Sequence, residues 1–134
     1  MKYNWNQFLS FSEALLQNDF WQDDVSTKYR IIISRAYYAA FHSAQNFLRD
    51  YHLESKRAGA EHEKVIIGLK EMHKKNADFQ RTCKKVGIHL ERLKVRRVQA
   101  DYRDHIVFND RDAKLSLRDS KKIIEDINAL KENL

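Results

Sequence analysis

The chain has 134 residues, enough for one domain, and a net charge of +6 at pH 7. It contains no proline and only three glycines, so the turn-forming residues that β-sandwiches and α/β folds need are nearly absent. One cysteine allows no internal disulfide, and neither a signal peptide nor an apolar run of the roughly 18 residues that a membrane span needs is present. We therefore expect a single all-α domain over residues 1–134, located in the cytoplasm and not in a membrane.

Two helices are predicted in the N-terminal part of the chain. The first spans about residues 5–20 with Asn4 as its N-cap, because apolar residues recur there every three or four positions. The second is capped by Ser26 or Thr27 and continues to about residue 53, since nothing in that stretch breaks a helix. The expected core-facing residues of this second helix are Ile33, Tyr37, Ala40, Phe41, Ala44, Leu48 and Tyr51.

A third, shorter helix is predicted over about residues 60–74, after a loop that begins at Ser55. The fourth begins at Ala77 or Asp78 and continues to about residue 105 or 107. It carries two opposed apolar stripes, Val86, Leu90 and Leu93 on one side and Val95, Val98, Tyr102 and Ile106 on the other. Either the domain itself covers both stripes, or one of them contacts another subunit.

The last helix follows a turn at residues 108–112 and continues to about residue 133. Asp110 or Asp112 is its expected cap. No internal repeat or linker separates a second domain. Together these elements predict an antiparallel, up-and-down bundle of four to five helices.

Three short elements carry a resemblance to a known family. Residues 34–44 read SRAYYAAFHSA on the second helix, His62 opens the third, and residues 97–102 read RVQADY on the fourth. In this order they resemble the HEPN-domain family, whose second helix carries a tyrosine pair and whose later helix carries an Arg-x-x-Ala-Asp-Tyr element. The resemblance implies a helical bundle, commonly dimeric, of toxin–antitoxin, defence and RNA-processing systems, often beside a nucleotidyltransferase.

Many members of that family are metal-independent ribonucleases with an Arg-x4-6-His motif near the dimer interface. There, arginine stabilises phosphate charge and histidine handles the proton of the attacking 2′-hydroxyl. On the fourth helix of this chain, seven residues separate Arg97 from His105, so that motif is not found on the expected helix. Arg35 with His42 fits the spacing, as does a pair that ends at His62, but a motif this short also occurs by chance.

We therefore single out six candidate catalytic residues. They are Arg97, His62, Arg35, His42, Asp101 and Tyr102. In this hypothesis Arg97, helped by Arg35, stabilises phosphate charge, either histidine transfers the proton, and the last two residues orient it. The alternative is structural: Arg97 forms an i,i+4 ion pair with Asp101, His62 is a partly buried core residue, and Arg35 and His42 lie in a packing or subunit interface, or are simply exposed.

A basic stripe on the fourth helix is the second candidate feature. Its members, which fall on one side of that helix, are Arg81, Lys85, Arg92, Arg96 and Arg103. Such a stripe is suited to contacting nucleic-acid phosphates without reading bases, and the alternative is an ordinary solvated face.

No metal or cofactor is expected. The histidine and cysteine spacing that zinc requires is absent around His62, and so is a glycine-rich phosphate loop. The leading hypothesis is a HEPN-like protein, homodimeric, that binds or cleaves RNA. The rivals are a non-catalytic interaction module whose partner is a nucleotidyltransferase, and a protein that binds a nucleotide in a cleft between helices.

Overall fold

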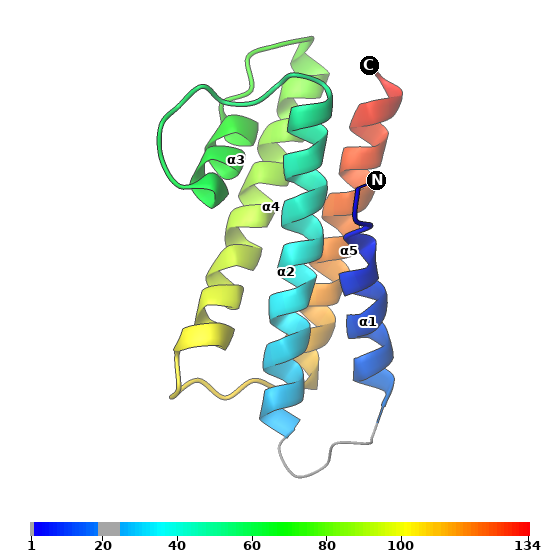
Figure 1. Cartoon of the computed structure of the whole chain (residues 1–134), viewed down its shortest axis with the longest axis vertical. Helices are drawn as coiled ribbons and strands as arrows, with labels where there is room; N and C mark the ends of the chain where they lie inside the picture. The colour runs from blue at the N-terminus through cyan, green and yellow to red at the C-terminus, as the bar shows by residue number, and fades with distance from the viewer. Residues whose placement is uncertain (1, 19–24) are drawn as a thin grey trace.

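A computed structural model describes residues 2–18 and 25–134, and these residues form five helices and no strand (Figure 1). The helices are α1 (Asn6–Gln17), α2 (Val25–Asp50), α3 (Glu61–Lys70), α4 (Ala77–Tyr102) and α5 (Asp110–Glu132). The four long helices run alternately up and down, and α3 lies in the connection between α2 and α4. The predicted all-α, up-and-down bundle is confirmed. None of the described helices is both long and apolar enough to cross a membrane.

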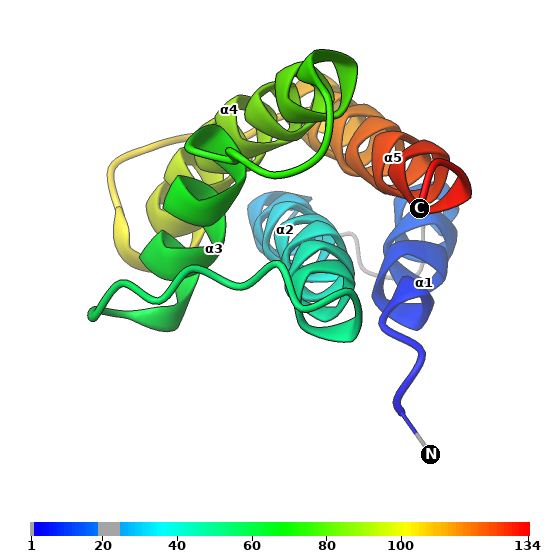
Figure 2. The ribbon, with the colours of Figure 1, turned by 90° about the horizontal axis from the view of Figure 1, so that it is seen from above.

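Helix α2 is the centre of the bundle and contacts each of the other four helices. Seen from above, α3, α4, α5 and α1 form an arc around it, and one side of α2 lies outside that arc (Figure 2). The side facing the arc carries fully buried side chains such as Ile33, Tyr37 and Phe47. Burial of each large apolar side chain contributes about 1.5–3 kcal/mol, so this side fixes the bundle.

The first helix begins one residue later than expected, because Trp5 occupies the N-cap position. The Asn4 side chain still accepts a hydrogen bond from the N–H of Asn6, at 3.1 Å. Helix α2 begins at Val25, so Ser26 and Thr27 lie inside its first turn and do not cap it. The predicted end of the first helix lies outside the described residues.

Helix α2 ends at residue 50, three residues before its predicted end. His52 adopts a left-handed conformation with φ 55°, and its N–H donates to the carbonyl of Arg49. The N–H of Leu53 then donates to the carbonyl of Leu48 at 2.8 Å, and both leucine side chains are buried in the main core. This is the Schellman arrangement, which usually has glycine at the left-handed position. As a result Tyr51, predicted in the core, is 40% exposed.

Helix α3 also ends early, at Lys70, and it packs closely against α4. The close approach occurs at Gly87, where an added Cβ would lie 2.7 Å from the Cγ of Lys70 and 3.1 Å from the carbonyl oxygen of Ile66. Helix α4 starts where predicted, because the Asn76 side chain accepts a hydrogen bond from the N–H of Phe79 at 2.9 Å. Gly87 therefore holds α3 against the middle of α4.

The C-terminal end of α4 is held by Arg30 of α2. Helix α4 stops at Tyr102, before its predicted end, because the Arg30 guanidinium binds carbonyl oxygens on both sides of that point. The four acceptors are Gln99, Ala100, Arg103 and Ile106, at 3.4, 2.8, 3.0 and 2.6 Å. The guanidinium carbon also lies 5.2 Å from the ring centre of Phe108. Arg30 therefore replaces the next helical turn as the partner of these carbonyls.

Helix α5 begins with a capping box. The Asn109 side chain accepts from the N–H of Asp112 at 3.0 Å, and the Asp112 carboxylate accepts from the N–H of Asn109 at 2.9 Å. The predicted cap, Asp110 or Asp112, is therefore wrong: the cap is Asn109, and the helix starts one residue before the position that a cap at Asp110 would give.

Only one of the two apolar stripes of α4 is buried by the domain. Val86, Leu90 and Leu93 lie in the main core with no exposed surface. On the opposite side Val95 is 54% exposed and Tyr102 is 69% exposed. The domain therefore does not cover both stripes, because Val95 and Tyr102 of the second stripe stay exposed.

Candidate nucleic-acid interface

The side chain of Arg97 lies where α2, α3 and α4 meet. Its position on the buried stripe of α4 directs it into the domain, and the residue is only 8% exposed. The guanidinium carbon lies 5.5 and 5.4 Å from the ring centres of Tyr37 and Tyr38, and 6.0 Å from that of Tyr102. Aromatic ring faces attract a cation at such distances. The tyrosine pair of α2 therefore provides most of the surroundings of this charge.

The hydrogen bonds of Arg97 are few for a desolvated cation. Its Nη1 donates to the Asp101 carboxylate at 3.3 Å, which is the i,i+4 pair expected from the sequence. The Ser34 hydroxyl donates to the same carboxylate oxygen at 3.4 Å. An arginine has five N–H donors, and the Nε of Arg97 is buried with no partner among the described residues. The ion pair exists, and it uses one of the five N–H donors of the guanidinium among the described residues.

His62, near the start of α3, lies beside the same two tyrosines, Tyr37 and Tyr38, as Arg97. Its Nδ1 lies 2.6 Å from the hydroxyl of Tyr37, and its ring stacks on Phe41 at 4.1 Å between ring centres. Partial burial, followed by the positive charges of Arg97 and Lys94, lowers the pKa of His62 below its usual value. The imidazole is therefore neutral at pH 7.

The hydroxyl of Tyr37 decides which nitrogen of His62 carries the proton. Burial raises the pKa of Tyr37, so the phenol keeps its proton at neutral pH. Within the described part of the chain, that proton has one acceptor, the Nδ1 of His62. Neutral imidazole with an occupied Nδ1 lone pair carries its hydrogen on Nε2. With the phenol as the donor to Nδ1, His62 presents an Nε2–H group, and in the other tautomer it presents a free Nε2 lone pair.

Arg35 and His42, the other predicted pair, contact helix α1. The His42 ring stacks on Trp5 with 3.6 Å between ring centres and 15° between planes. The Arg35 guanidinium carbon lies 5.1 Å from the ring centre of Phe8. The structure thus brings together four of the six candidate residues, Arg97, His62, Asp101 and Tyr102, and places the other two in the packing of α1 against α2.

The HEPN domain family matches residues 7–130 of the chain. The chain belongs to the HEPN family. The match includes nearly all of the five helices and all six candidate catalytic residues. Comparison with curated proteins and with solved structures finds no match.

In this HEPN domain a line of aromatic rings connects the N-terminal side of α1, helix α2 and the start of α3. The line consists of Trp5 on α1's N-terminal side, His42 and Tyr38 on α2, and His62 on α3. Successive ring centres are 3.6, 6.1 and 6.0 Å apart, and all four residues are partly exposed. We call this line the aromatic strip. Sequence reasoning missed Trp5 because its contact with α2 joins distant parts of the chain.

The predicted basic stripe of α4 lies partly against α5. Arg96 donates to the Ser116 hydroxyl at 3.1 Å and also pairs with Asp119. The Lys85 ammonium lies 3.9 Å from the Asp126 carboxylate. The other three members, Arg81, Arg92 and Arg103, are exposed. The stripe therefore offers less free positive charge than its sequence indicates.

Metal-ligating side chains do not gather in this HEPN domain. Among residues 2–18 and 25–134, no group of three histidine, cysteine, aspartate or glutamate side chains is arranged to hold a metal ion. What the described site presents chemically is the Arg97 guanidinium and the His62 imidazole beside partly exposed rings. Such a set can bind an anion and stack planar groups.

Proposed function

We propose that this HEPN domain binds single-stranded RNA across α2, with Arg97 and His62 donating to a backbone phosphate. The observation that carries the proposal is the state of Arg97, which is 8% exposed yet uses only one of its N–H groups within the described chain. Removing a cation from water costs several kcal/mol unless hydrogen bonds replace the water. A phosphate oxygen is the acceptor that a guanidinium matches best.

The aromatic strip supports a single strand in preference to a duplex. Unpaired bases expose their faces and stack on aromatic side chains, and each such contact is worth about 1–3 kcal/mol. The strip leads from Trp5 to His62, so stacked bases would bring the sugar-phosphate backbone to Arg97. The net charge of +6 adds a general attraction for polyanions.

The test is the affinity of a fluorescently labelled single-stranded RNA of about twelve nucleotides, measured by anisotropy. Arg97→Met should weaken binding at least about tenfold, because a desolvated charge pair with phosphate is lost. Arg118→Met is the matched control, since this arginine is 76% exposed on α5 and its loss changes the net charge equally. Equal affinities of the two variants would contradict a specific role for Arg97.

RNA cleavage is the second candidate, and the approach of Arg97 and His62 from two helices favours it. Attack by a 2′-hydroxyl needs a base that takes its proton and a cation that stabilises the phosphate. For His62 to act as that base, its Nε2 must be free of hydrogen. Then Nδ1 would donate to the Tyr37 oxygen, the reverse of the hydrogen bond argued above. The geometry thus supports binding more directly than cleavage.

Incubation of the purified protein with RNA, with and without EDTA, distinguishes RNA cleavage from RNA binding alone. Metal-independent cleavage should persist in EDTA. It should be lost in His62→Ala and Arg97→Ala while circular dichroism shows an unchanged helical content. Cleavage at the original rate in either variant would exclude these residues as the catalytic pair, and no cleavage by the wild type would leave RNA binding as the function.

We also infer that two copies of the chain associate, as HEPN domains often do. Ile31, Tyr102 and Val107 are apolar side chains that are 39%, 69% and 84% exposed. Arg30 ties the start of α2 to residues 103 and 106, which places these three at one end of the bundle. Val107→Asp should lower the molar mass measured by light scattering, whereas Phe11→Asp on α1 should not. If the wild type is monomeric, the association of two copies is contradicted, and the partner of this surface would be another protein, such as a nucleotidyltransferase.

A further inference from the structure

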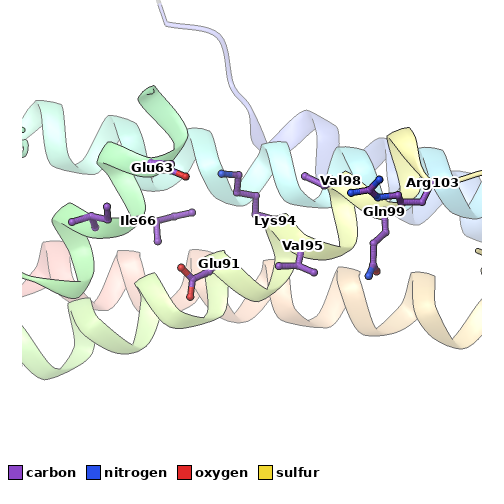
Figure 3. Close-up of a pocket in the computed structure, with 9 residues that line it drawn as sticks. Glu63, Ile66, Glu91, Lys94, Val95, Val98, Gln99 and Arg103 are labelled. Carbon is purple, nitrogen blue, oxygen red and sulfur yellow. The ribbon is translucent and has the colours of Figure 1, made fainter. Parts of the chain in front are cut away.

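Two openings of the surface lie beside α4, and only one of them borders the site. A groove of about 550 Å³ between α3 and α4 is lined by Val95 and Val98 of the exposed stripe, and by neither Arg97 nor His62 (Figure 3). A smaller opening of about 250 Å³ lies between α2 and α4 and has Asp101 in its lining. The two openings share no lining residue. The carboxylate that pairs with Arg97 therefore faces a surface distinct from the groove.

The carboxylate of Asp101 can accept more hydrogen bonds than it receives. An ionised carboxylate has about four acceptor positions. Its two donors, the Nη1 of Arg97 at 3.3 Å and the Ser34 hydroxyl at 3.4 Å, both bond Oδ2, and both distances are long for hydrogen bonds. Within residues 2–18 and 25–134, no group donates to Oδ1. The side chain is 28% exposed, so Oδ1 is available to a ligand.

Asp101, Arg97 and His62 follow one another along α2. Their partners on that helix, in the same order and about one turn apart, are Ser34, Tyr38 and Phe41. Arg97 therefore has His62 on one side and Asp101 on the other. A phosphate bound to Arg97 has Asp101 within the reach of the sugar that is attached to it.

The charge of Asp101 restricts what that sugar can be. A carboxylate repels a phosphate held a few ångströms away, unless the ligand also brings a hydrogen-bond donor to the carboxylate. Phosphate oxygens only accept, whereas the 2′-hydroxyl of ribose can donate, and deoxyribose has no such group. A hydrogen bond to an ionised acceptor is about twice as strong as one between neutral groups. Ribose therefore compensates the repulsion and deoxyribose does not.

We infer that Asp101 accepts a hydrogen bond from the 2′-hydroxyl of a bound ribose and is the residue through which this HEPN domain selects RNA over DNA. This inference rests on the proposed RNA binding and adds to it a determinant of sugar specificity. It differs from the catalytic hypothesis, in which Asp101 orients a histidine and does not contact the RNA.

The probes are two strands of the same sequence, the RNA used to test Arg97 and a strand in which fluorine replaces every 2′-hydroxyl. Fluorine keeps the sugar conformation close to that of RNA but has no proton to donate. Wild type should bind the RNA about tenfold tighter than the fluorinated strand. Asp101→Ala should bind the two strands within about twofold of each other, because the change in this ratio isolates the contact of one side chain.

The matched control is Glu63→Ala, which also removes one carboxylate near the site. Glu63 is exposed on α3 and lines the groove of Figure 3, so the variant should keep the wild-type ratio. Asp101 lies in the last turn of α4, and alanine is the best helix former, so Asp101→Ala should fold. Circular dichroism of both variants checks this.

Three results would overturn the role of Asp101 while RNA binding at Arg97 stands. The first is a wild type that binds both strands equally. The second is a ratio that persists in Asp101→Ala, and the third is a folded Asp101→Ala that binds neither strand, since the carboxylate then only holds Arg97 in place. An RNA affinity that is unchanged in Arg97→Met would instead overturn the proposed function itself.

Discussion

Two arginines join α2 to α4, and their surroundings differ. Arg30 extends from α2 to the C-terminal end of α4 and donates to four carbonyl oxygens. Arg97 extends from the middle of α4 towards α2, where it donates to Asp101 at 3.3 Å and otherwise lies against tyrosine rings. Arg97 is the more buried of the two and has the fewer partners. The number of hydrogen bonds, and not the depth of burial, therefore distinguishes the two arginines.

The physical reason lies in what each arginine neutralises. The last carbonyls of a helix have no partner within it and carry partial negative charge, so a cation there both satisfies and stabilises them. Aromatic faces attract a cation but accept little hydrogen bonding. Arg97 is thus held between aromatic rings while its Nε has no hydrogen-bond partner among the described residues.

The largest effect we expect on stability comes from Arg30→Met. The variant leaves the carbonyls at the end of α4 without their charged donor, and hydrogen bonds to charged groups contribute about 1.5–3 kcal/mol. We expect the free energy of unfolding in urea to fall by about 2–3 kcal/mol on that basis. Arg118→Met, on the exposed side of α5, should change it by less than about 0.5 kcal/mol. A loss below about 1 kcal/mol for Arg30→Met would contradict the structural role.

Arg97→Met should change the same free energy by less than about 1 kcal/mol, although Arg97 is the more buried arginine. It removes one hydrogen bond but also removes a poorly solvated charge, and the Asp101 side chain that remains is 28% exposed and can be hydrated. The measurements are the free energy of unfolding in urea and the RNA affinity of the same variant. If the variant loses as much stability as Arg30→Met while its RNA affinity is unchanged, Arg97 is a second structural arginine.

Most of the fold could be predicted because helix periodicity is a local signal. The five helices, the buried stripe of α4 and the burial of Arg97 all follow from spacing along the chain. The ends of α2 and α4 could not be predicted in the same way. One depends on a left-handed His52, a position where glycine is usual, and the other on Arg30, about seventy residues away from its acceptors.

The site was predictable only in part. The resemblance to HEPN proteins selected Arg97, His62, Asp101 and Tyr102, which lie together, and their roles stay predictions. Packing was one of the alternatives for Arg35 and His42, but their contact with α1 could not be predicted, since it depends on how α1 docks on α2. The position of α3 could not be predicted either, because it depends on how closely this helix approaches α4 at Gly87.

Tyr37→Phe tests the second donor of the site. Loss of the phenol removes the partner of the His62 Nδ1 and should cost about 1 kcal/mol of unfolding free energy, the usual value of one hydrogen bond. The decisive measurement is the ¹⁵N chemical shifts of the His62 ring at pH 8, which report the tautomer. Wild type should carry its hydrogen on Nε2, and the variant should show a mixture. A hydrogen on Nδ1 in the wild type would mean that His62 is prepared as a base, which favours cleavage.

The smallest effect that we expect is on the pH dependence of the unfolding free energy. In the folded protein, burial and then Arg97 keep the pKa of His62 below the unfolded value of about 6.5. Between the lowered folded pKa and about pH 6.5 the unfolded chain binds more protons, so the unfolding free energy should decrease as pH falls through that window. His62→Gln should reduce this decrease but not remove it, because burial also lowers the pKa of His42.

The pKa of His62 compares the two arginines directly. Arg97 contributes to the lowered pKa of His62, so Arg97→Met should move that pKa upward, towards its ordinary value, although burial still keeps it below. Arg30 is not among the groups that shift His62, and Arg30→Met should leave its pKa where it is. NMR titration of the His62 ring signals in the three proteins measures both effects. An unmoved pKa in Arg97→Met would mean that its charge is already neutralised, and the case for an anion at this position would fail.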